Sequence, residues 1–191
     1  MIPRVPLVTQ ERADELGAAW GMSGPRMTRS AVRVLAQNPE MAQAVLGLLS
    51  QLLERNKLDA RLRELVIMRI GWVTGSAYEW TQHWRVATVT ANIPPEDVLA
   101  VRDWKNSTRL TAADKAVLAA TDETLAGTSI SDATWAEVVK AIPDPAHQVE
   151  FVVAMGNWTM FSMLLRNLRV PVEEGVMIWP PDGKPSPAAE A

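Results

Sequence analysis

Apolar residues recur three and four positions apart along almost the whole chain, the spacing that places them on one face of a helix. No segment shows the strict alternation of apolar and polar residues that is typical of a half-buried strand. Capping residues, prolines and glycines divide the pattern into segments. We therefore predict an all-α fold of about seven to eight helices, over residues 10–20, 39–55, 58–74, 77–90, 95–104, 112–127, 132–141 and 145–168.

Two of these segments resemble each other. Residues 64–72, ELVIMRIGW, align with residues 150–158, EFVVAMGNW, with a glutamate first, apolar residues next and a tryptophan last. A duplicated helical hairpin would produce this match, and chance similarity between apolar helices would produce it as well.

The length of the chain suits one domain and a short tail. A chain of 191 residues and 21.0 kDa can bury a sizeable core, so we predict a single helical domain over residues 1–179. Residues 180–191, PPDGKPSPAAEA, contain four prolines and few side chains to bury. We predict that they form a flexible tail.

Composition and charge exclude several classes of function. A net charge of -3 lacks the basic excess that nucleic-acid binding needs. We expect no signal peptide, because the first residues, MIPRVPLVTQERADE, lack its apolar stretch. We expect no membrane span, because the longest apolar stretch, residues 151–165, is short and interrupted by polar residues. These features favour a cytoplasmic protein with neither nucleic-acid nor membrane partners. The chain has no cysteine, which excludes disulfides, thiolate metal sites and thiol nucleophiles.

The residues that could carry chemistry gather in one segment, residues 63–83, RELVIMRIGWVTGSAYEWTQH. Glu79 and His83 stand four positions apart and therefore share a face of one helix. Glu64 lies on the preceding helix, and the tight connection at Gly75 folds the two helices together. A histidine titrates near neutral pH, so His83 is the best candidate for moving a proton, with Glu79 or Glu64 orienting its ring.

Residues 76–83, SAYEWTQH, have the spacing of a cysteine, two residues, a second cysteine, three residues and a histidine. With Glu64 placed before it, this pattern resembles the carboxymuconolactone decarboxylase and alkylhydroperoxidase D-like superfamily. The resemblance covers roughly residues 38–174, and it includes the stretches LDARLREL, IPPEDVLAV and HQVEFVVAMGNWTMFSMLLRNLRVPVE. It implies that family's helical fold, and it implies self-association as a homotrimer or homohexamer.

The departures from the family pattern limit the chemistry that the resemblance implies. Ser76 and Glu79 occupy the two cysteine positions, so reduction of a peroxide by a thiolate and its resolving partner is chemically impossible. The lactone decarboxylase branch needs no cysteine pair, and this chain looks more like that branch. We therefore expect a cofactor-free lyase or isomerase that moves a proton on a small organic acid or lactone, with His83, Glu79 and Glu64 as its catalytic residues.

Aromatic residues near the motif are candidates for binding the substrate. We predict that Trp72, Tyr78, Trp80 and Ser76 line the site, although tryptophans that anchor the core or a subunit interface fit the pattern as well. Two glutamates and one histidine leave too few ligands for a metal ion, so neither a metal nor another cofactor is expected.

Each catalytic candidate also has an ordinary structural explanation. Ser76 and Glu79 have the spacing of a capping box, in which the serine caps a helix and the glutamate reaches back to its amide. Glu64 would then be a buried hydrogen-bond partner between helices, and His83 a core histidine. These explanations favour a non-catalytic family member, an oligomeric scaffold or a small-molecule binder.

Overall fold

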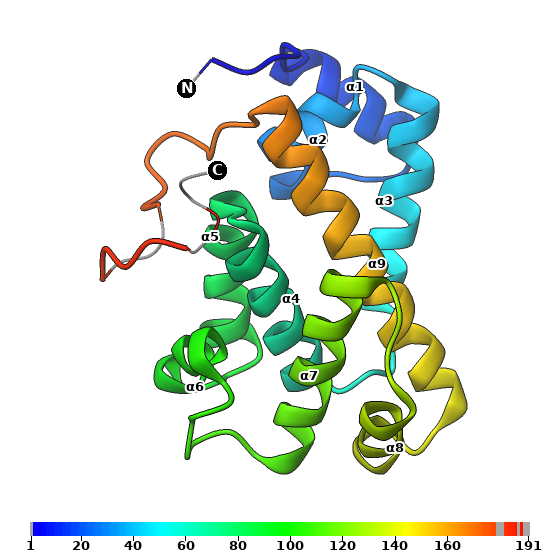
Figure 1. Ribbon diagram of the computed structural model, residues 1–191. Coiled ribbons are helices and arrows are strands. Elements are labelled where there is room, and N and C mark those ends of the chain that lie inside the picture. The colour runs from blue at the N-terminus through cyan, green and yellow to red at the C-terminus, as the bar shows by residue number, and fades with distance from the viewer. Residues whose placement is uncertain (1, 179–181, 187, 189–191) are drawn as a thin grey trace. The chain divides into compact units, whose positions relative to one another are not determined.

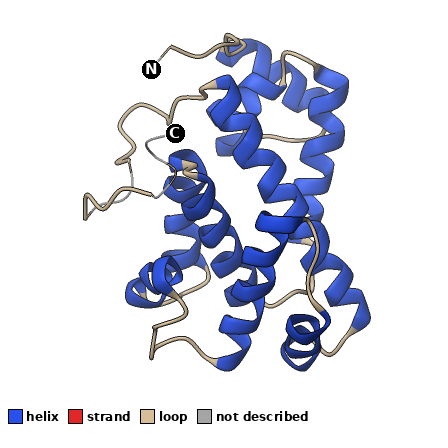
Figure 2. Cartoon of the chain, in the orientation of Figure 1, coloured by secondary structure: helices blue, strands red, loops and turns tan. Residues whose placement is uncertain are grey.

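The structure, a computed structural model, describes residues 2–178, 182–186 and 188, and every regular element within these residues is a helix (Figures 1 and 2). In chain order the elements are α1 (Gln10–Ala19), η1 (Gly24–Arg26), α2 (Ser30–Leu35), α3 (Pro39–Glu54), α4 (Ala60–Thr74), α5 (Ala77–Arg85), η2 (Val86–Thr90), α6 (Pro95–Ala100), η3 (Val101–Asp103), α7 (Ala112–Gly127), α8 (Asp132–Ala141) and α9 (Pro145–Leu168). The prediction of an all-α fold is confirmed.

Most helix boundaries follow from side chains that cap the first turn. The side chains of Thr9, Asn38 and Ser131 each accept a hydrogen bond from the backbone three residues later. Thr111 and Asp114 cap α7 reciprocally. Because such residues are visible in the sequence, the predicted starts of these helices agree closely with the structure.

Two features of the helices differ from the prediction. The short helix α2 was not predicted, because no side chain caps its start; it forms where Ala31, Val32, Val34 and Leu35 are buried. The predicted helix 77–90 ends as an α-helix at Arg85 and continues as η2, a wider π-helical turn.

The chain divides into two compact units. The N-terminal unit contains the residues up to Asn56 together with Leu164–Met177, and the motif unit contains Lys57–Met163 together with the described residues from Ile178 onward. Whether these units behave as the single predicted domain stays a prediction, and so does the duplication of a helical hairpin.

The N-terminal unit has a core of its own, formed by Ala13, Met27, Val32 and Leu46. Gly17 on α1 faces this core, and a Cβ atom there would lie 2.8 Å from the Met27 side chain. This helix therefore approaches Met27 as closely as it does only because residue 17 is glycine.

The motif unit is built around α4, which contacts α5 and α7 and whose residues 62–68 and 70–72 are all buried (Figure 1). The helix begins at Asp59, whose side chain accepts a hydrogen bond from the amide of Leu62. It ends at Gly75, which has a left-handed conformation with φ of 69° that glycine adopts without strain. The turn at Gly75 brings α5 back along α4, and this places the motif on two adjacent helices.

Two arginines on α4 fasten it to the neighbouring helices. Arg61 donates two hydrogen bonds to the Asp114 carboxylate, at 3.0 and 2.9 Å, and one to Asp97, at 3.0 Å. Arg69 donates two to the Asp122 carboxylate, at 2.7 and 2.9 Å. Planar two-point contacts of this kind fix direction as well as distance, so they hold α4 in one orientation against α6 and α7.

Part of the predicted tail, residues 180–191, is described. Asp182 forms an ion pair with Arg102 at 2.9 Å, and the Ser186 hydroxyl donates a hydrogen bond to the carbonyl of Trp72. Residues 180, 181, 187 and 189–191 lie outside the described residues, so flexibility of the tail stays a prediction. Among the helices that the structure describes, none has the length and apolar character needed to cross a membrane.

Candidate acid–base site

Glu64, Glu79 and His83, which we call the acid–base cluster, come together in the motif unit. Glu64 lies on α4, and Glu79 and His83 lie one turn apart on α5. The two helices meet at Gly71 of α4, where a Cβ atom would lie 3.4 Å from the amide nitrogen of Trp80, in van der Waals contact. The structure therefore brings the three predicted side chains together.

Glu64 and His83 form the central contact of the cluster. The Nδ1 atom of His83 lies 2.7 Å from Oε2 of Glu64, and the other carboxylate oxygen accepts a hydrogen bond of 3.0 Å from Nε of Arg63. Glu64 is completely buried. Both of its oxygens thus have charged or polar partners, which is how a buried carboxylate stays ionised.

The second ring nitrogen of His83 has two neighbours. The indole N–H of Trp158, on α9, donates a hydrogen bond of 3.1 Å to Nε2. Only an unprotonated Nε2 can accept this bond, so the neutral ring carries its proton on Nδ1 and donates it to Glu64. The nearest oxygen of Glu79 lies 3.7 Å from Nε2, within ion-pair range and beyond a hydrogen bond.

Burial and the neighbouring charges shift the pKa values of the cluster. The pKa of Glu64 is lowered, because the charge and hydrogen bond of His83, followed by those of Arg63, outweigh the burial that would raise it. Burial raises the pKa of Glu79, with a smaller contribution from the charge of Glu64. The pKa of His83 is also raised, because the charge and hydrogen bond of Glu64 and the charge of Glu79 outweigh burial.

The geometry around His83 is compatible with two protonation states of its ring, protonated and neutral. The charges of Glu64 and Glu79 favour a protonated His83, whereas the hydrogen bond from Trp158 favours the neutral ring. In the protonated form, Nε2–H can no longer accept the Trp158 hydrogen bond, and the nearest carboxyl oxygen is that of Glu79, at 3.7 Å. Direct transfer of a proton between Nε2 of His83 and Glu79 would require the two groups to come closer than this.

The small exposed part of the acid–base cluster belongs to His83 and Glu79. The His83 side chain is 10% exposed and that of Glu79 is 7% exposed, whereas Glu64 is 0% exposed. His83 and Glu79 are thus the two members of the cluster that reach the surface at all, whereas Glu64 contacts His83 and Arg63 and has no exposed surface.

The capping-box explanation of Glu79 is wrong. Among the described residues the Ser76 hydroxyl has no hydrogen-bond partner, although it is buried, and it makes no capping hydrogen bond to α5. The amide of Ser76, which Glu79 would have to reach, instead donates to the carbonyl of Gly71 at 2.9 Å. Because the turn at the end of α4 already engages the Ser76 amide in a hydrogen bond, the Glu79 carboxyl group does not bond to that amide and lies near His83 instead.

The four predicted substrate-binding residues, Ser76, Trp72, Tyr78 and Trp80, lie near the cluster in sequence and are all buried, with exposed fractions of 1–6%. The rings of Trp72 and Trp80 pack edge to face with centroids 5.7 Å apart. Their role in binding a substrate stays a prediction. Within the described part of the chain, no group of three or more acidic, histidine or cysteine side chains is placed to hold a metal ion.

Sequence reasoning missed two members of the site. Trp158 forms a hydrogen bond to His83 that joins residues 75 positions apart, and no local pattern indicates such a contact. Arg63 was missed because neighbouring residues on a helix do not normally face each other. An arginine next to a glutamate indicates an ion pair of this kind only when both side chains are known to be buried, and the sequence alone does not show that.

The comparisons with known proteins agree with the fold and the motif. Residues 39–123 match the model of the carboxymuconolactone decarboxylase family. The debrominase Bmp8, in complex with 2,3,4-tribromopyrrole, has a similar structure, with a TM-score of 0.72 and 16% identity over 91% of this chain and 94% of that one. No curated protein matches the sequence significantly.

Two further solved structures are similar. An uncharacterized peroxidase-related protein from Silicibacter sp. has a TM-score of 0.70 and 14% identity over 87% of this chain and 85% of that one. The alkylhydroperoxidase AhpD core of a peroxidase-related protein from Ralstonia eutropha has a TM-score of 0.71 and 12% identity, covering 91% and 94%. At these identities the likeness establishes the fold.

The family match over residues 39–123 and the fold both agree with the resemblance of this chain to the carboxymuconolactone decarboxylase and alkylhydroperoxidase D-like superfamily. The chain lacks a redox cysteine pair, because it contains no cysteine and has Ser76 and Glu79 at the two cysteine positions of the motif.

Proposed function

We propose that this protein is a cofactor-free lyase or isomerase that moves a proton on a small carboxylate or lactone. His83 and Glu79 are its proton-transfer pair, and Glu64 positions His83. The observation that carries the proposal is the Glu79 carboxyl group, which lies 3.7 Å from Nε2 of His83 and is not used in capping its helix.

The reaction would use the two proton positions of the pair. One group removes a proton from carbon, or carbon dioxide leaves, and an enolate results. The partner group then returns a proton to the same or another carbon. After an isomerisation, the proton on the first group passes to the partner; after loss of carbon dioxide, the pair takes up one proton from water. Either step restores the starting state. The raised pKa of Glu79 favours its protonated form, which can give a proton, and Glu64 offsets the charge that forms on the imidazole.

The buried Ser76 hydroxyl supports a substrate at this site. It has no hydrogen-bond partner among the described residues, so its O–H remains available to a substrate oxygen. A flat, compact substrate also suits the fold, because Bmp8 has a similar structure and binds 2,3,4-tribromopyrrole. That structure is of a variant with a cysteine replaced by alanine. The present chain has no cysteine, so thiol-dependent reduction is not part of this proposal.

We also propose that the protein forms a homotrimer or homohexamer. One side of α9 exposes Val149, Val152, Val153 and Met163, with exposed fractions of 39–64%. These residues recur at helical spacing and surround Gly156, where a Cβ atom would meet no atom within 4 Å. Copies of the same helix could pack closely along such a stripe, and light scattering would measure the resulting mass.

The experiment for the catalytic proposal is proton exchange with the solvent. Unsaturated carboxylates and lactones are incubated with the protein in D₂O, and proton NMR follows deuterium entering carbon and loss of carbon dioxide. For a substrate that the protein turns over, His83→Ala and Glu79→Gln should each slow exchange by about 10²–10⁴-fold. The control Glu137→Gln, at an exposed ion pair, should leave the rate unchanged. Full exchange rates in both variants would refute the proposal.

A non-catalytic binding or scaffold role is the second candidate. It is favoured by the complete hydrogen bonding of the His83 ring, which has Glu64 on one nitrogen and Trp158 on the other. In that case a bound carboxylate would shift the NMR signals of His83 but would show no exchange or turnover. Binding without exchange across the whole panel would favour this role over the enzyme.

A further inference from the structure

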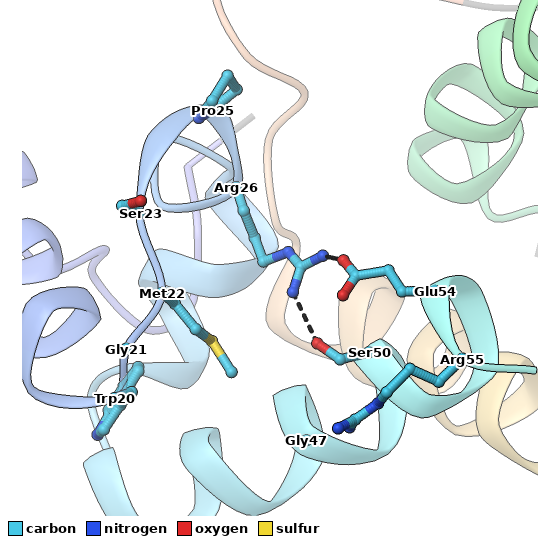
Figure 3. Close-up of a pocket in the computed structure, with 10 residues that line it drawn as sticks. All are labelled: Trp20, Gly21, Met22, Ser23, Pro25, Arg26, Gly47, Ser50, Glu54 and Arg55. Atoms are coloured by element: carbon cyan, nitrogen blue, oxygen red, sulfur yellow. Dashed lines mark hydrogen bonds and ion pairs between the residues drawn. The ribbon is translucent and has the colours of Figure 1, made fainter.

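The N-terminal unit contains a cavity of about 500 Å³, the size of a small-molecule site. Its walls come from the loop after α1, from η1 and from one side of α3 (Figure 3). All of its lining residues belong to the N-terminal unit, whereas the acid–base cluster belongs to the motif unit. An inference about this cavity is therefore independent of the proposed function.

A glycine in the middle of α3 keeps the cavity open. Gly47 lines it, and a Cβ atom at this position would meet no atom within 4 Å. Glycine inside a helix costs roughly 0.5–1 kcal/mol relative to alanine, and here no close packing requires it. On the opposite wall, Gly21 has a φ of 69°, which turns the chain away from α1.

One wall of the cavity is fixed by a paired arginine. Arg26 donates a hydrogen bond of 2.7 Å to the Ser50 hydroxyl and forms an ion pair with Glu54 (Figure 3). These contacts tie the loop to α3. They also balance the charge of Arg26, so this residue shapes the cavity without leaving an unpaired cation.

A second arginine lining the cavity has no such balance. Within the described part of the chain, the guanidinium of Arg55 makes no hydrogen bond or ion pair, and Figure 3 shows it lying along α3 near Gly47. The cavity therefore has two guanidinium groups and one carboxylate, an excess of one positive charge. Its other side carries Trp20 and the thioether of Met22, which offer apolar surface to a flat group.

We propose that this cavity binds a small organic carboxylate with a flat apolar body. The carboxylate pairs with Arg55, whose planar guanidinium can donate two parallel hydrogen bonds to it. The flat body lies between Gly47 and the side of the cavity formed by Trp20 and Met22. The pocket is open to solvent on one side, and it combines apolar surface with one oriented charged group, as small-molecule sites do.

Isothermal titration calorimetry with benzoate, phenylacetate and the neutral benzamide tests this assignment. The wild-type protein should bind the two carboxylates saturably, and benzamide about tenfold more weakly or less, because benzamide cannot form the ionic hydrogen bonds. Affinity for the carboxylates should also fall as salt is added.

Three variants complete the experiment. Arg55→Gln should weaken carboxylate binding by about tenfold or more. Gly47→Leu should abolish binding by filling the cavity, while its thermal stability shows that the fold is intact. Arg12→Gln removes an exposed arginine of the same unit that lies outside the cavity and should bind like the wild type. Absence of saturable carboxylate binding, or equal binding by the wild type, Arg55→Gln and Gly47→Leu, would overturn the proposal.

Discussion

Replacing Glu64 by glutamine tests the electrostatic reasoning at the centre of the acid–base cluster. The change keeps the size and shape of the side chain and removes its charge. In the wild type, the carboxylate is 0% exposed and balances Arg63 on one side and His83 on the other, at 3.0 and 2.7 Å. The variant leaves the Arg63 guanidinium, whose side chain is 10% exposed, without a counter-charge.

The expected cost follows from that burial. Removing one partner of a buried ion pair typically costs about 3–5 kcal/mol, because the remaining charge is uncompensated. Glutamine still accepts one hydrogen bond, so we expect about 3 kcal/mol, at the low end of that range. For a protein of this size the corresponding fall in melting temperature is about 6–12 °C.

The pKa of His83 gives a second, independent measurement. The chain has only two histidines, so proton NMR can follow both imidazoles during one pH titration. We expect Glu64→Gln to lower the pKa of His83, because it removes the charge and the hydrogen bond that raise it.

The pH dependence of the stability loss has a definite sign. A raised pKa in the folded state contributes stability below the ordinary value of 6.5, and this contribution disappears as the pH rises through the pKa of folded His83. The His83 part of the loss in Glu64→Gln should therefore be largest in mild acid. Wild-type stability in the variant, or an unchanged pKa of His83, would refute the electrostatic account.

Three further predictions concern the same unit. Trp158→Phe removes the hydrogen bond that favours neutral His83, so the pKa of His83 should rise further and stability should fall by about 1–2 kcal/mol; an unchanged titration would show that the indole contact does not hold in solution. Arg61→Gln leaves the carboxylates of Asp97 and Asp114 without their shared cation, and urea unfolding should show a loss of about 2–4 kcal/mol; a loss below about 0.5 kcal/mol, the strength of an exposed pair, would contradict the clamp. The acid–base cluster by itself should make stability rise with pH toward 4.5, because the pKa of Glu64 is lowered in the folded protein. Stability should fall at higher pH, as Glu79 and His83, whose pKa values are raised, lose their protons. Thermal melts across this range would contradict the pKa directions if stability rose steadily into the alkaline range.

The helices and the family resemblance could be predicted from the sequence because the signals for both are local. Helical spacing and caps such as Asn38 and Thr111 depend on bonds that join residues only a few positions apart. The same holds for Glu79 and His83, which share a helix face at any tertiary arrangement. The lack of cysteine is a matter of composition, and it excludes thiol chemistry in whatever way the chain folds.

The use of the motif residues depends on tertiary packing, which local patterns do not encode. The sequence fits a capping box at Ser76 as well as it fits an acid–base pair. The structure decides between the two, because in the Gly75 turn the Ser76 amide donates its hydrogen bond to the carbonyl of Gly71. The contact of Trp158 with His83, and with it the position of the ring proton, comes from packing across a long sequence separation. The pKa directions also come from the fold, because burial raises the pKa of Glu79 and the charges packed around Glu64 and His83 outweigh burial there. Neither burial nor these contacts can be read from the neighbours in sequence.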